Sequence, residues 1–271
     1  MTQEILVLGA TGKTGRRVVQ ALDKTGAAVR AASRSSAVRF DWADESTWQP
    51  ALSGATAAYV IAPDDPAAAA PFVDQAKTSG VRLVLLSGKA LDEIPHDVFA
   101  GMHAAEEAVR ASDLPWTILR ANNFAQNFSE ELWQPGIRAG RLALPVDDTP
   151  EPFVDVHDIA EVAALVLTTE GHEGQTYTLT GPETITFDTA VAKISAALGR
   201  PVELARPTPD EYREILLAEG LPEELITELN GMYEAMRKGL LATPTDDVSR
   251  LLGREATSFD TYVAGALDAW R

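Results

Sequence analysis

Three glycines near the start of the chain have the spacing that a dinucleotide-binding turn requires. Gly9, Gly12 and Gly15 directly follow the apolar run 4–8 and precede a helical pattern over 16–22. The first glycine allows a tight turn, the second lets backbone approach a pyrophosphate, and the third lets the helix pack closely on the strand. Free N–H groups at the helix N-terminus then attract the phosphates. The pattern predicts a strand, a phosphate-binding turn and a helix; an ordinary glycine-rich turn is the alternative.

The end of the second expected strand distinguishes between the two nicotinamide dinucleotides. An acidic residue there would hold a ribose 2′-hydroxyl and repel a 2′-phosphate, but this chain has Arg34 between serines. Arginine is always charged and binds phosphate through two parallel hydrogen bonds, so NADP(H) is the predicted cofactor, with a solvated loop arginine as the alternative. Lys13 and Arg16 flank the glycine turn and add positive charge. Asp41 and Trp42 follow the third expected strand, where Trp42 either borders the adenine or packs in the core.

The composition excludes several classes of protein and of site. The chain has 271 residues, of which 45% are hydrophobic, enough for one large α/β domain or a nucleotide domain with a smaller lobe. Its net charge of −17 disfavours nucleic acid as a partner, because phosphate backbones would be repelled. The absence of cysteine excludes disulfides, thiolate catalysis and cysteine-bound metals. We expect no metal site, because the four histidines (His96, His103, His157 and His172) form no ligand pair at short spacing.

No segment has the pattern of a leader or a membrane span. The chain starts Met1-Thr2-Gln3-Glu4, without the basic residues of a signal peptide, and no apolar run approaches the roughly 18 residues that cross a bilayer. We therefore expect a cytoplasmic protein with no membrane partner. Its leaning to Ala, Arg, Asp and Glu is typical of a GC-rich bacterial genome. The oligomeric state stays open, with a homodimer as one option.

Short apolar runs alternate with helical segments over the first 128 residues. Continuously apolar strands are typical of a parallel sheet that helices cover on both faces. The order predicts an α/β fold with a doubly wound parallel Rossmann sheet. The expected strands are 4–8, 28–32, 38–41, 57–61, 81–86 and 116–120, and the expected helices are 13–24, 46–52, 66–79 and 103–112.

The alternation loosens after about residue 128. Residues 153–156 resemble a strand, and Asp158 is expected to cap the helix that follows it. We expect a dinucleotide-binding domain of residues 1–128, to which 151–183 returns. Residues 129–150 and 184–271 are expected to form a smaller, mainly helical C-terminal substrate lobe over the carboxyl ends of the strands, where ligands of such folds bind.

Several motifs together indicate a family. They are Gly9–Gly15, Leu86-Ser87-Gly88, His103–Glu107, Leu114–Phe124 and Val154–Ala160. On these motifs the chain resembles the NmrA-like branch of atypical short-chain dehydrogenases, and within it the bacterial NAD(P)H:quinone oxidoreductases. Gly220–Leu225 and Lys238-Gly239 resemble the substrate lobe of those enzymes, so the resemblance covers nearly the whole chain.

The resemblance implies roles for individual residues. Around the pyrophosphate it implies Gly9, Thr11, Gly12, Lys13 and Thr14, with Gly15 completing the turn, and at the 2′-phosphate Arg34. Ala62 and Pro63 would border the adenine ribose, and Ser87, Gly88 and Lys89 would lie near the nicotinamide ribose. Asn122, Asn123 and Phe124 would lie by the nicotinamide and the substrate pocket.

The catalytic pair of the wider superfamily is missing. Most short-chain dehydrogenases use Tyr-x-x-x-Lys, in which the lysine lowers the tyrosine pKa for proton transfer. None of the five tyrosines here has a lysine four residues on. A quinone is already a good hydride acceptor and needs positioning more than a strong acid. The candidate catalytic residues are His103, Lys89 and Asn123. His103 is either a weak proton donor or a packed or solvated helix-start residue, and Lys89 is either a ribose-orienting residue or an exposed loop lysine.

Two functions follow from these observations. The first is an NADPH-dependent reductase of a quinone or related conjugated carbonyl, working without a Tyr-Lys dyad. The alternative is a non-catalytic NADP(H)-binding redox sensor that acts through a protein partner. The absence of the Tyr-Lys pair is consistent with this function as well. An open apolar crevice would favour the reductase. Phe124, Trp133 and Tyr233 are expected either to line that crevice for an aromatic ring or to form the hydrophobic seam between the lobes.

Overall fold

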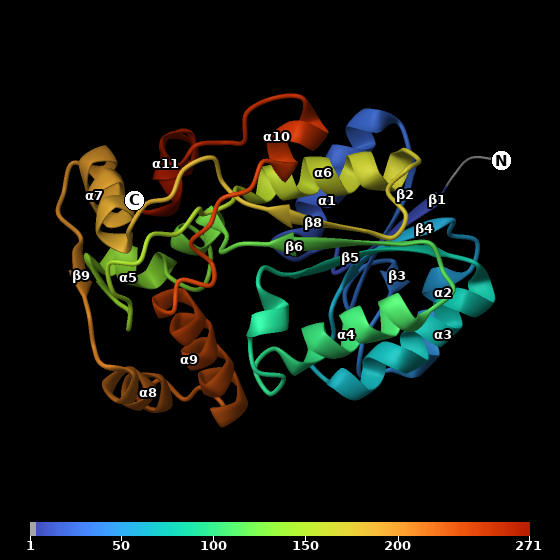
Figure 1. Ribbon diagram of the computed structural model, residues 1–271, viewed down its shortest axis with the longest axis horizontal. Coiled ribbons are helices and arrows are strands. Elements are labelled where there is room, and N and C mark those ends of the chain that lie inside the picture. Colours follow the sequence, from blue (N-terminus) through green and yellow to red (C-terminus); the bar gives the residue numbers. More distant parts are fainter. Residues whose placement is uncertain (1–3) are drawn as a thin grey trace.

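A seven-stranded parallel sheet forms the centre of the computed structural model, which describes residues 4–271 (Figure 1). The strand order is β3-β2-β1-β4-β5-β6-β8, so the chain winds outward from β1 in both directions, and the predicted doubly wound fold is confirmed. The strands are β1 (Glu4–Leu8), β2 (Ala28–Ser33), β3 (Val38–Arg39), β4 (Ala57–Ile61), β5 (Arg82–Gly88), β6 (Trp116–Ala121) and β8 (Gln175–Leu179). Met1, Thr2 and Gln3, which enter the expectation about a leader, lie outside the described residues.

Helices cover both faces of this sheet, which explains why its strands are apolar throughout. Ile5 and Val7 of β1 pack into the core on one face, and Leu6 and Leu8 pack into the core on the other. The helices of the first face are α1 (Gly15–Thr25), α6 (Val156–Thr168) and α10 (Asp247–Leu252), and those of the second are α2 (Trp48–Leu52), α3 (Ala69–Ser79) and α4 (Ala100–Ala111) (Figure 1).

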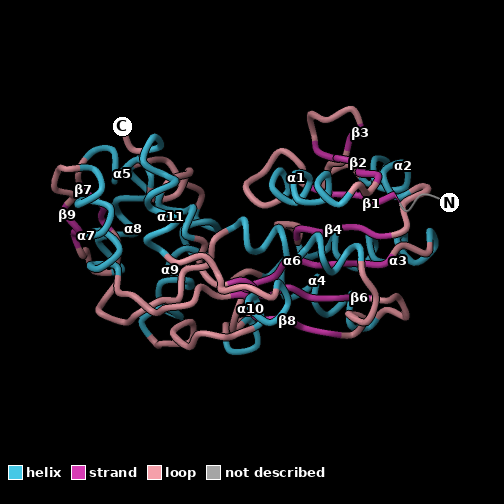
Figure 2. Tube along the Cα trace, turned by 90° about the horizontal axis from the view of Figure 1, so that it is seen from above, coloured by secondary structure: helices cyan, strands magenta, loops and turns pink. Residues whose placement is uncertain are grey.

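A smaller lobe lies beside the carboxyl ends of the strands (Figures 1 and 2). Its elements are α5 (Gln134–Ala139), β7 (Arg141–Ala143), α7 (Phe187–Leu198), β9 (Glu203–Ala205), α8 (Pro209–Ala218), α9 (Glu223–Arg237) and α11 (Phe259–Ala266). The two strands β7 and β9 pair in parallel, and the other elements are helices. No helix within residues 4–271 is both long and apolar enough to span a membrane.

Aromatic side chains form the core of the small lobe. Phe128 and Trp133 meet edge to face at 4.6 Å between ring centroids, and Phe187 packs on Trp133 at 5.1 Å. Phe153, from the segment before α6, joins the same cluster at 5.3 Å from Phe128. Edge-to-face pairs of this kind add to the burial of apolar area, so the lobe has a hydrophobic core of its own.

The segment before α6 differs from its sequence prediction. Residues 153–156 form no strand; Val154 makes one isolated parallel bridge with Phe124 instead. Helix α6 begins at Val156 and is capped by Asp155, whose side chain accepts a hydrogen bond from the His157 amide at 2.7 Å. The expectation that Asp158 caps this helix is wrong, because Asp158 is fully buried and accepts from the Thr257 amide at 2.7 Å.

The C-terminal region also differs from the expected domain division. Helix α10 packs against α6 and β8 of the large sheet, although residues 184–271 were expected to belong entirely to the small lobe. The Asp247 carboxylate at its start accepts a hydrogen bond from the Thr178 amide of β8 at 2.7 Å. This contact satisfies a main-chain donor on the edge strand, so the chain returns to the large domain before it ends in the small lobe.

Candidate active site

The glycine turn after β1 has the close packing that the sequence predicts. Gly9 has a φ of +63°, and the Gly12 amide donates to its carbonyl at 2.8 Å. A Cβ atom on Gly15 would lie 2.2 Å from the Gly9 carbonyl oxygen, so no side chain fits at the start of α1. The amides of Thr11, Lys13 and Thr14 donate to no acceptor within residues 4–271. They are available to an anion, and the turn therefore fits a dinucleotide pyrophosphate.

The basic side chains around this turn contact residues 127–131, in the segment that leads from the sheet into the small lobe. Lys13 Nζ donates to Asn127 Oδ1 at 2.8 Å and lies 3.6 Å from the Glu131 carboxylate. Arg16 donates to the Glu130 carboxylate at 2.5 Å. Burial lowers the pKa of Lys13, and Glu131 and Glu130 oppose that shift. The positive charge at the glycine turn is thus held in place by acidic side chains that a phosphate would have to approach.

Arg34 lies where a 2′-phosphate group is expected. It directly follows β2, its side chain is exposed, and it makes no ion pair or hydrogen bond within residues 4–271. The hydroxyl of Ser33 accepts from the amides of Ser35 and Ser36, at 3.2 and 3.0 Å, and so shapes the turn around it. The guanidinium is therefore free to bind an anionic group.

Residues predicted at the adenine side have clear packing roles. The Trp42 ring packs at 4.8 Å from Phe72 and 5.0 Å from Phe40, which favours the packing interpretation of this residue. The Asp41 side chain accepts from the Ala43 amide at 3.1 Å. The Pro63 carbonyl lies so close to Gly101 that a Cβ there would meet it at 1.8 Å. Pro63 thus fixes the start of α4, whereas its neighbour Ala62 lines a cavity.

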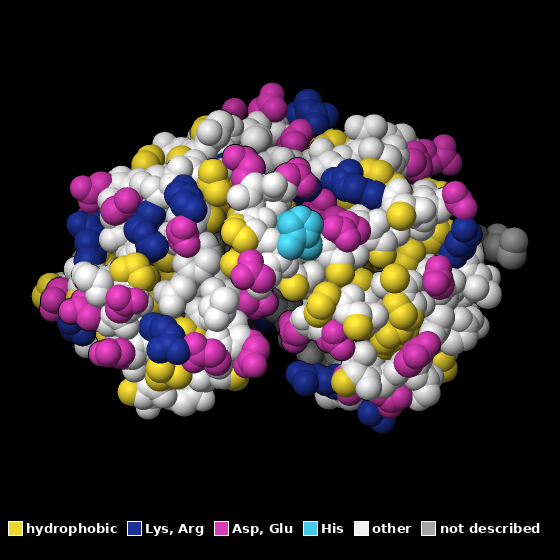
Figure 3. Space-filling model, turned by 60° about the horizontal axis from the view of Figure 1, so that its bottom comes forward, with side chains coloured by type: hydrophobic (Ala, Val, Ile, Leu, Met, Phe, Trp, Pro, Cys, Tyr) yellow, Lys and Arg dark blue, Asp and Glu magenta, His cyan; other side chains and the backbone are white. Residues whose placement is uncertain are grey.

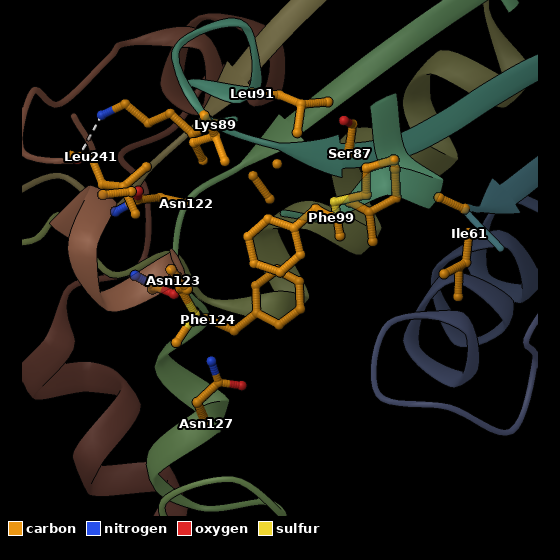
Figure 4. A pocket seen from close by; sticks show the side chains of 18 residues that line it. Ile61, Ser87, Lys89, Leu91, Phe99, Asn122, Asn123, Phe124, Asn127 and Leu241 are labelled. Carbon is orange, nitrogen blue, oxygen red and sulfur yellow. Dashed lines mark hydrogen bonds between the residues drawn. The ribbon is translucent and has the colours of Figure 1, made fainter. Parts of the chain in front are cut away.

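A cavity of about 230 Å³ opens at the carboxyl ends of β4, β5 and β6. An apolar void of about 150 Å³ accepts benzene, so this one accommodates a single aromatic ring. In the segment between β5 and α4, Ala90 and Phe99 adopt left-handed backbone conformations, with φ of 57° and 56°. The lining includes Ile61, Ala62, Leu86, Ser87, Gly88, Lys89, Leu91, Ile94, Phe99, Met102, Ala121, Asn122, Asn123, Phe124, Asn127, Met232, Ala235 and Leu241 (Figure 4).

Both lobes contribute to this cavity, and it adjoins the glycine turn. Met232 and Ala235 come from α9 of the small lobe, whereas Leu86 and Ala121 come from the sheet. Asn127, which lines the cavity, accepts the hydrogen bond from Lys13 of the turn. On the face seen in Figure 3 a notch separates the lobes, with acidic side chains on both rims. A dinucleotide on the glycine turn would therefore have an apolar cavity beside it, at the carboxyl ends of the strands where ligands of this fold bind.

Behind the polar wall of the cavity lies a residue that the sequence analysis did not identify. Glu151 is fully buried, and its carboxylate accepts from the side-chain amides of Asn122 at 3.2 Å and Asn123 at 3.3 Å. Burial raises the pKa of Glu151 to about 7, although both amide donors and the charge of Lys89 oppose the shift. In the sequence its signal is a single acidic residue between Pro150 and Pro152, ahead of an apolar run.

Lys89 is buried and directed away from the cavity. Its ammonium donates to the carbonyl of Leu241 at 2.7 Å and also to that of Thr243 (Figure 4). Burial lowers the pKa of Lys89, and Glu151 opposes that shift. The solvated-loop interpretation is therefore wrong, and Lys89 instead ties the end of β5 to the chain that leaves the small lobe.

His103 lies in the first turn of α4 but does not line the cavity. Its ring stacks on His96 at 4.2 Å, and its Nε2 atom has no hydrogen-bond partner within residues 4–271. Burial, with a smaller contribution from His96, lowers the pKa of His103. The ring is therefore neutral at pH 7 and packed, as the alternative interpretation expected.

Two of the three predicted pocket aromatics belong to the core of the small lobe. Trp133 and Tyr233 are buried, and the Trp133 indole donates to the Tyr233 hydroxyl at 2.9 Å. The prediction that they line the pocket is wrong, because their rings pack inward among Phe128, Phe187 and Tyr212. Phe124 does line the cavity.

Comparison with known proteins assigns the family. The profile of the NmrA-like family matches residues 1–263. The chain belongs to the NmrA-like family. Among its relatives, the (4-alkanoyl-5-oxo-2,5-dihydrofuran-3-yl)methyl phosphate reductase of Streptomyces griseus is 34% identical over 285 residues, which cover 98% of this chain and 99% of that protein. The NAD(P)H azoreductase of Xenophilus azovorans is 30% identical over 277 residues, which cover 95% and 96%.

Solved structures of two further proteins share the fold. The NADPH-dependent quinone oxidoreductase of Escherichia coli in complex with NADPH has a TM-score of 0.83 at 24% identity and covers 96% of this chain and 99% of its own. The negative transcriptional regulator NmrA in complex with NADP has a TM-score of 0.79 at 18% identity, covering 99% and 96%. The predicted family and fold are confirmed, and the predicted cofactor, NADP(H), is the one that both neighbours hold.

Proposed function

We propose that this NmrA-like protein is an NADPH-dependent oxidoreductase that reduces a quinone or a related conjugated carbonyl compound. The observation that carries the proposal is the apolar cavity beside the glycine turn, which accommodates one flat ring. The names of its relatives agree with reduction of conjugated acceptors, since they include an azoreductase and a quinone oxidoreductase. We place the reaction in the cytoplasm and leave a homodimer open.

The cofactor would be held at three places along the carboxyl edge of the sheet. The free amides of Thr11, Lys13 and Thr14 would bind the pyrophosphate, and Arg34 would bind the 2′-phosphate. Ser87, Gly88 and Asn122 would surround the nicotinamide end. When bound, NADPH supplies a hydride to an electrophilic acceptor.

The residues of the cavity would act by positioning and by excluding water. Phe99, Phe124 and Met102 present apolar surface to a ring, and Asn127, whose Oδ1 accepts from Lys13, offers its Nδ2 group to an oxygen atom of that ring. We assign the product's proton to solvent rather than to His103, because that ring is neutral and does not line the cavity. Lys89 would hold the two lobes together around the cavity rather than transfer a proton.

The test is NADPH consumption by the purified protein with benzoquinones, naphthoquinones and matched saturated ketones. The proposal predicts turnover with quinones and none with the saturated ketones, because the chain has no Tyr-Lys pair to protonate an alkoxide. Tight binding of NADPH without turnover of any acceptor would contradict it. That result would favour the redox-sensor alternative, with which the absence of the Tyr-Lys pair also agrees. The next experiment would then be to identify a protein partner.

A further inference from the structure

Glu151 is fixed in place behind the cavity by its own main chain. It lies in the segment that leads into α6, and its amide and carbonyl both pair with Ile185, at 2.8 and 3.0 Å. Its side chain is fully buried. A buried carboxyl group is normally held by a cation, yet no ion pair with Glu151 exists within residues 4–271.

The partners of this carboxyl group are two neutral amides of the cavity lining. Oε2 accepts from Nδ2 of Asn122 at 3.2 Å and from Nδ2 of Asn123 at 3.3 Å. Oε1 has no hydrogen-bond partner in the described chain. Nδ2 of Asn122 also donates to the Pro152 carbonyl at 3.2 Å, and Oδ1 of Asn122 is buried, so Asn123 is the amide whose orientation depends on Glu151. The charged side chain that faces Glu151 is Lys89, from the end of β5, whose ammonium is bonded to the carbonyls of Leu241 and Thr243 instead.

The protonation state of Glu151 determines how Asn123 orients its side-chain amide. An ionised carboxylate only accepts hydrogen bonds, so it holds Nδ2 of Asn123 toward itself and leaves Oδ1 of Asn123 to another partner. A protonated carboxyl group donates through one oxygen, which allows an amide to turn its Nδ2 group outward. Asn122, Asn123 and Asn127 lie on one side of the cavity, opposite Ile61 and Ser87 (Figure 4).

We propose that Glu151 is a positioning residue that makes this wall a hydrogen-bond acceptor: while ionised, it holds Nδ2 of Asn123 and directs Oδ1 of Asn123 toward an N–H or O–H donor of the bound ligand. The two donors available in the proposed reaction are the primary carboxamide of the cofactor and the hydroxyl of a reduced quinone. The inference rests on the proposed function for the identity of these ligands. Because burial raises the pKa of Glu151 to about 7, the change occurs near neutral pH.

The first test compares the binding of NADP+ from pH 5.5 to 8.5 in the full-length wild type and Glu151→Gln. Glutamine keeps an acceptor oxygen but does not titrate, so the ratio of the two affinities reports Glu151 alone, whereas ionisation of the 2′-phosphate affects both proteins. We expect the ratio to change about three- to tenfold across pH 7, the effect of one hydrogen bond. Glu170→Gln is the matched control, because Glu170 is exposed and has no partner within residues 4–271; it should follow the wild type.

Two further measurements identify the donor. The acetylpyridine analogue of NADP+ keeps the ring carbonyl but has no N–H group, so its affinity should lose the pH dependence if the carboxamide is the donor. Inhibition by a hydroquinone should show the dependence if the hydroxyl is the donor. A wild-type to Glu151→Gln ratio that is constant with pH for NADP+ and for the hydroquinone overturns the proposal.

An observation on the unmodified, ligand-free protein covers the case in which the variant does not fold. The side-chain amide signals of Asn122 and Asn123 in NMR spectra should shift together with one midpoint near pH 7, as Glu151 titrates. Signals that do not move across this range would overturn the proposal. Binding and NMR involve no acceptor, so a pH-dependent wall without quinone turnover would remove the proposed function and leave the role of Glu151 intact.

Discussion

The glycine turn and the polar wall of the cavity are built by opposite means. At the turn, Gly9 and Gly15 leave room, so that main-chain amides face a ligand. At the wall, the buried side chains of Asn122 and Glu151 and the half-buried side chain of Asn123 fill space with polar groups. A site made of backbone fails when an atom is added, whereas a site made of buried side chains also responds to a proton. Steric changes should therefore break the first region, and changes of charge or pH should break the second.

The largest effect is expected from Gly15→Ala. The new Cβ atom would lie 2.2 Å from the Gly9 carbonyl oxygen, so the turn must shift and its amides lose their alignment. We expect NADPH affinity to fall more than about 100-fold, as several charge-assisted hydrogen bonds are lost. Calorimetric titration measures the change. Gly265→Ala in α11 is the control, because its Cβ meets nothing within 4 Å, and equal losses in both variants would refute the steric role.

The second effect concerns folding stability and Glu151. Its pKa is raised from 4.5 to about 7 by burial, so folding takes up a proton between these values and stability falls as pH rises through them. The loss between pH 4.5 and 8 amounts to up to about 3 kcal/mol. Urea unfolding at several pH values should show this slope in the wild type and in Glu170→Gln. Glu151→Gln should lack it, and curves that stay parallel would show that Glu151 does not titrate in this range.

The third effect separates the two dinucleotides. Arg34→Ala should weaken NADPH binding by about 10- to 100-fold, because charged hydrogen bonds contribute about 1.5–3 kcal/mol, while NADH binding changes little. Arg138→Ala serves as the control, because Arg138 is also exposed but lies in α5 of the small lobe. Equal losses of affinity for NADPH and NADH would show that Arg34 does not bind the 2′-phosphate.

The smallest effect distinguishes the lobe core from the cavity. Tyr233→Phe leaves the Trp133 indole N–H without its acceptor, which should cost about 1–2 kcal/mol of unfolding free energy. NADPH affinity and turnover should stay unchanged, since neither ring lines the cavity. A change in the Michaelis constant for a quinone, with stability unaltered, would instead show that Trp133 and Tyr233 line the substrate pocket.

The sequence predicts the glycine turn and the doubly wound sheet because both depend on neighbours along the chain. Gly9, Gly12 and Gly15 lie within seven residues, and the apolar strands alternate with helices at regular spacing. Glu151 meets Asn122 and Asn123 only through the fold, 28 or more residues apart, so no local pattern indicates the contact. Trp133 and Tyr233 lie 100 residues apart, and an aromatic residue that packs inward has the same local pattern as one that lines a pocket.

The central claim is that a flat acceptor is reduced inside the cavity between the lobes. It is tested most directly by NADPH oxidation with one quinone in the wild type and in Met232→Trp, which fills the cavity from α9 and leaves the sheet untouched. We predict turnover by the wild type and a loss of kcat/KM for the quinone of at least about tenfold in the variant, because a ring-sized volume is removed. An equally active variant, or a wild type that binds NADPH and reduces no quinone, would contradict the claim.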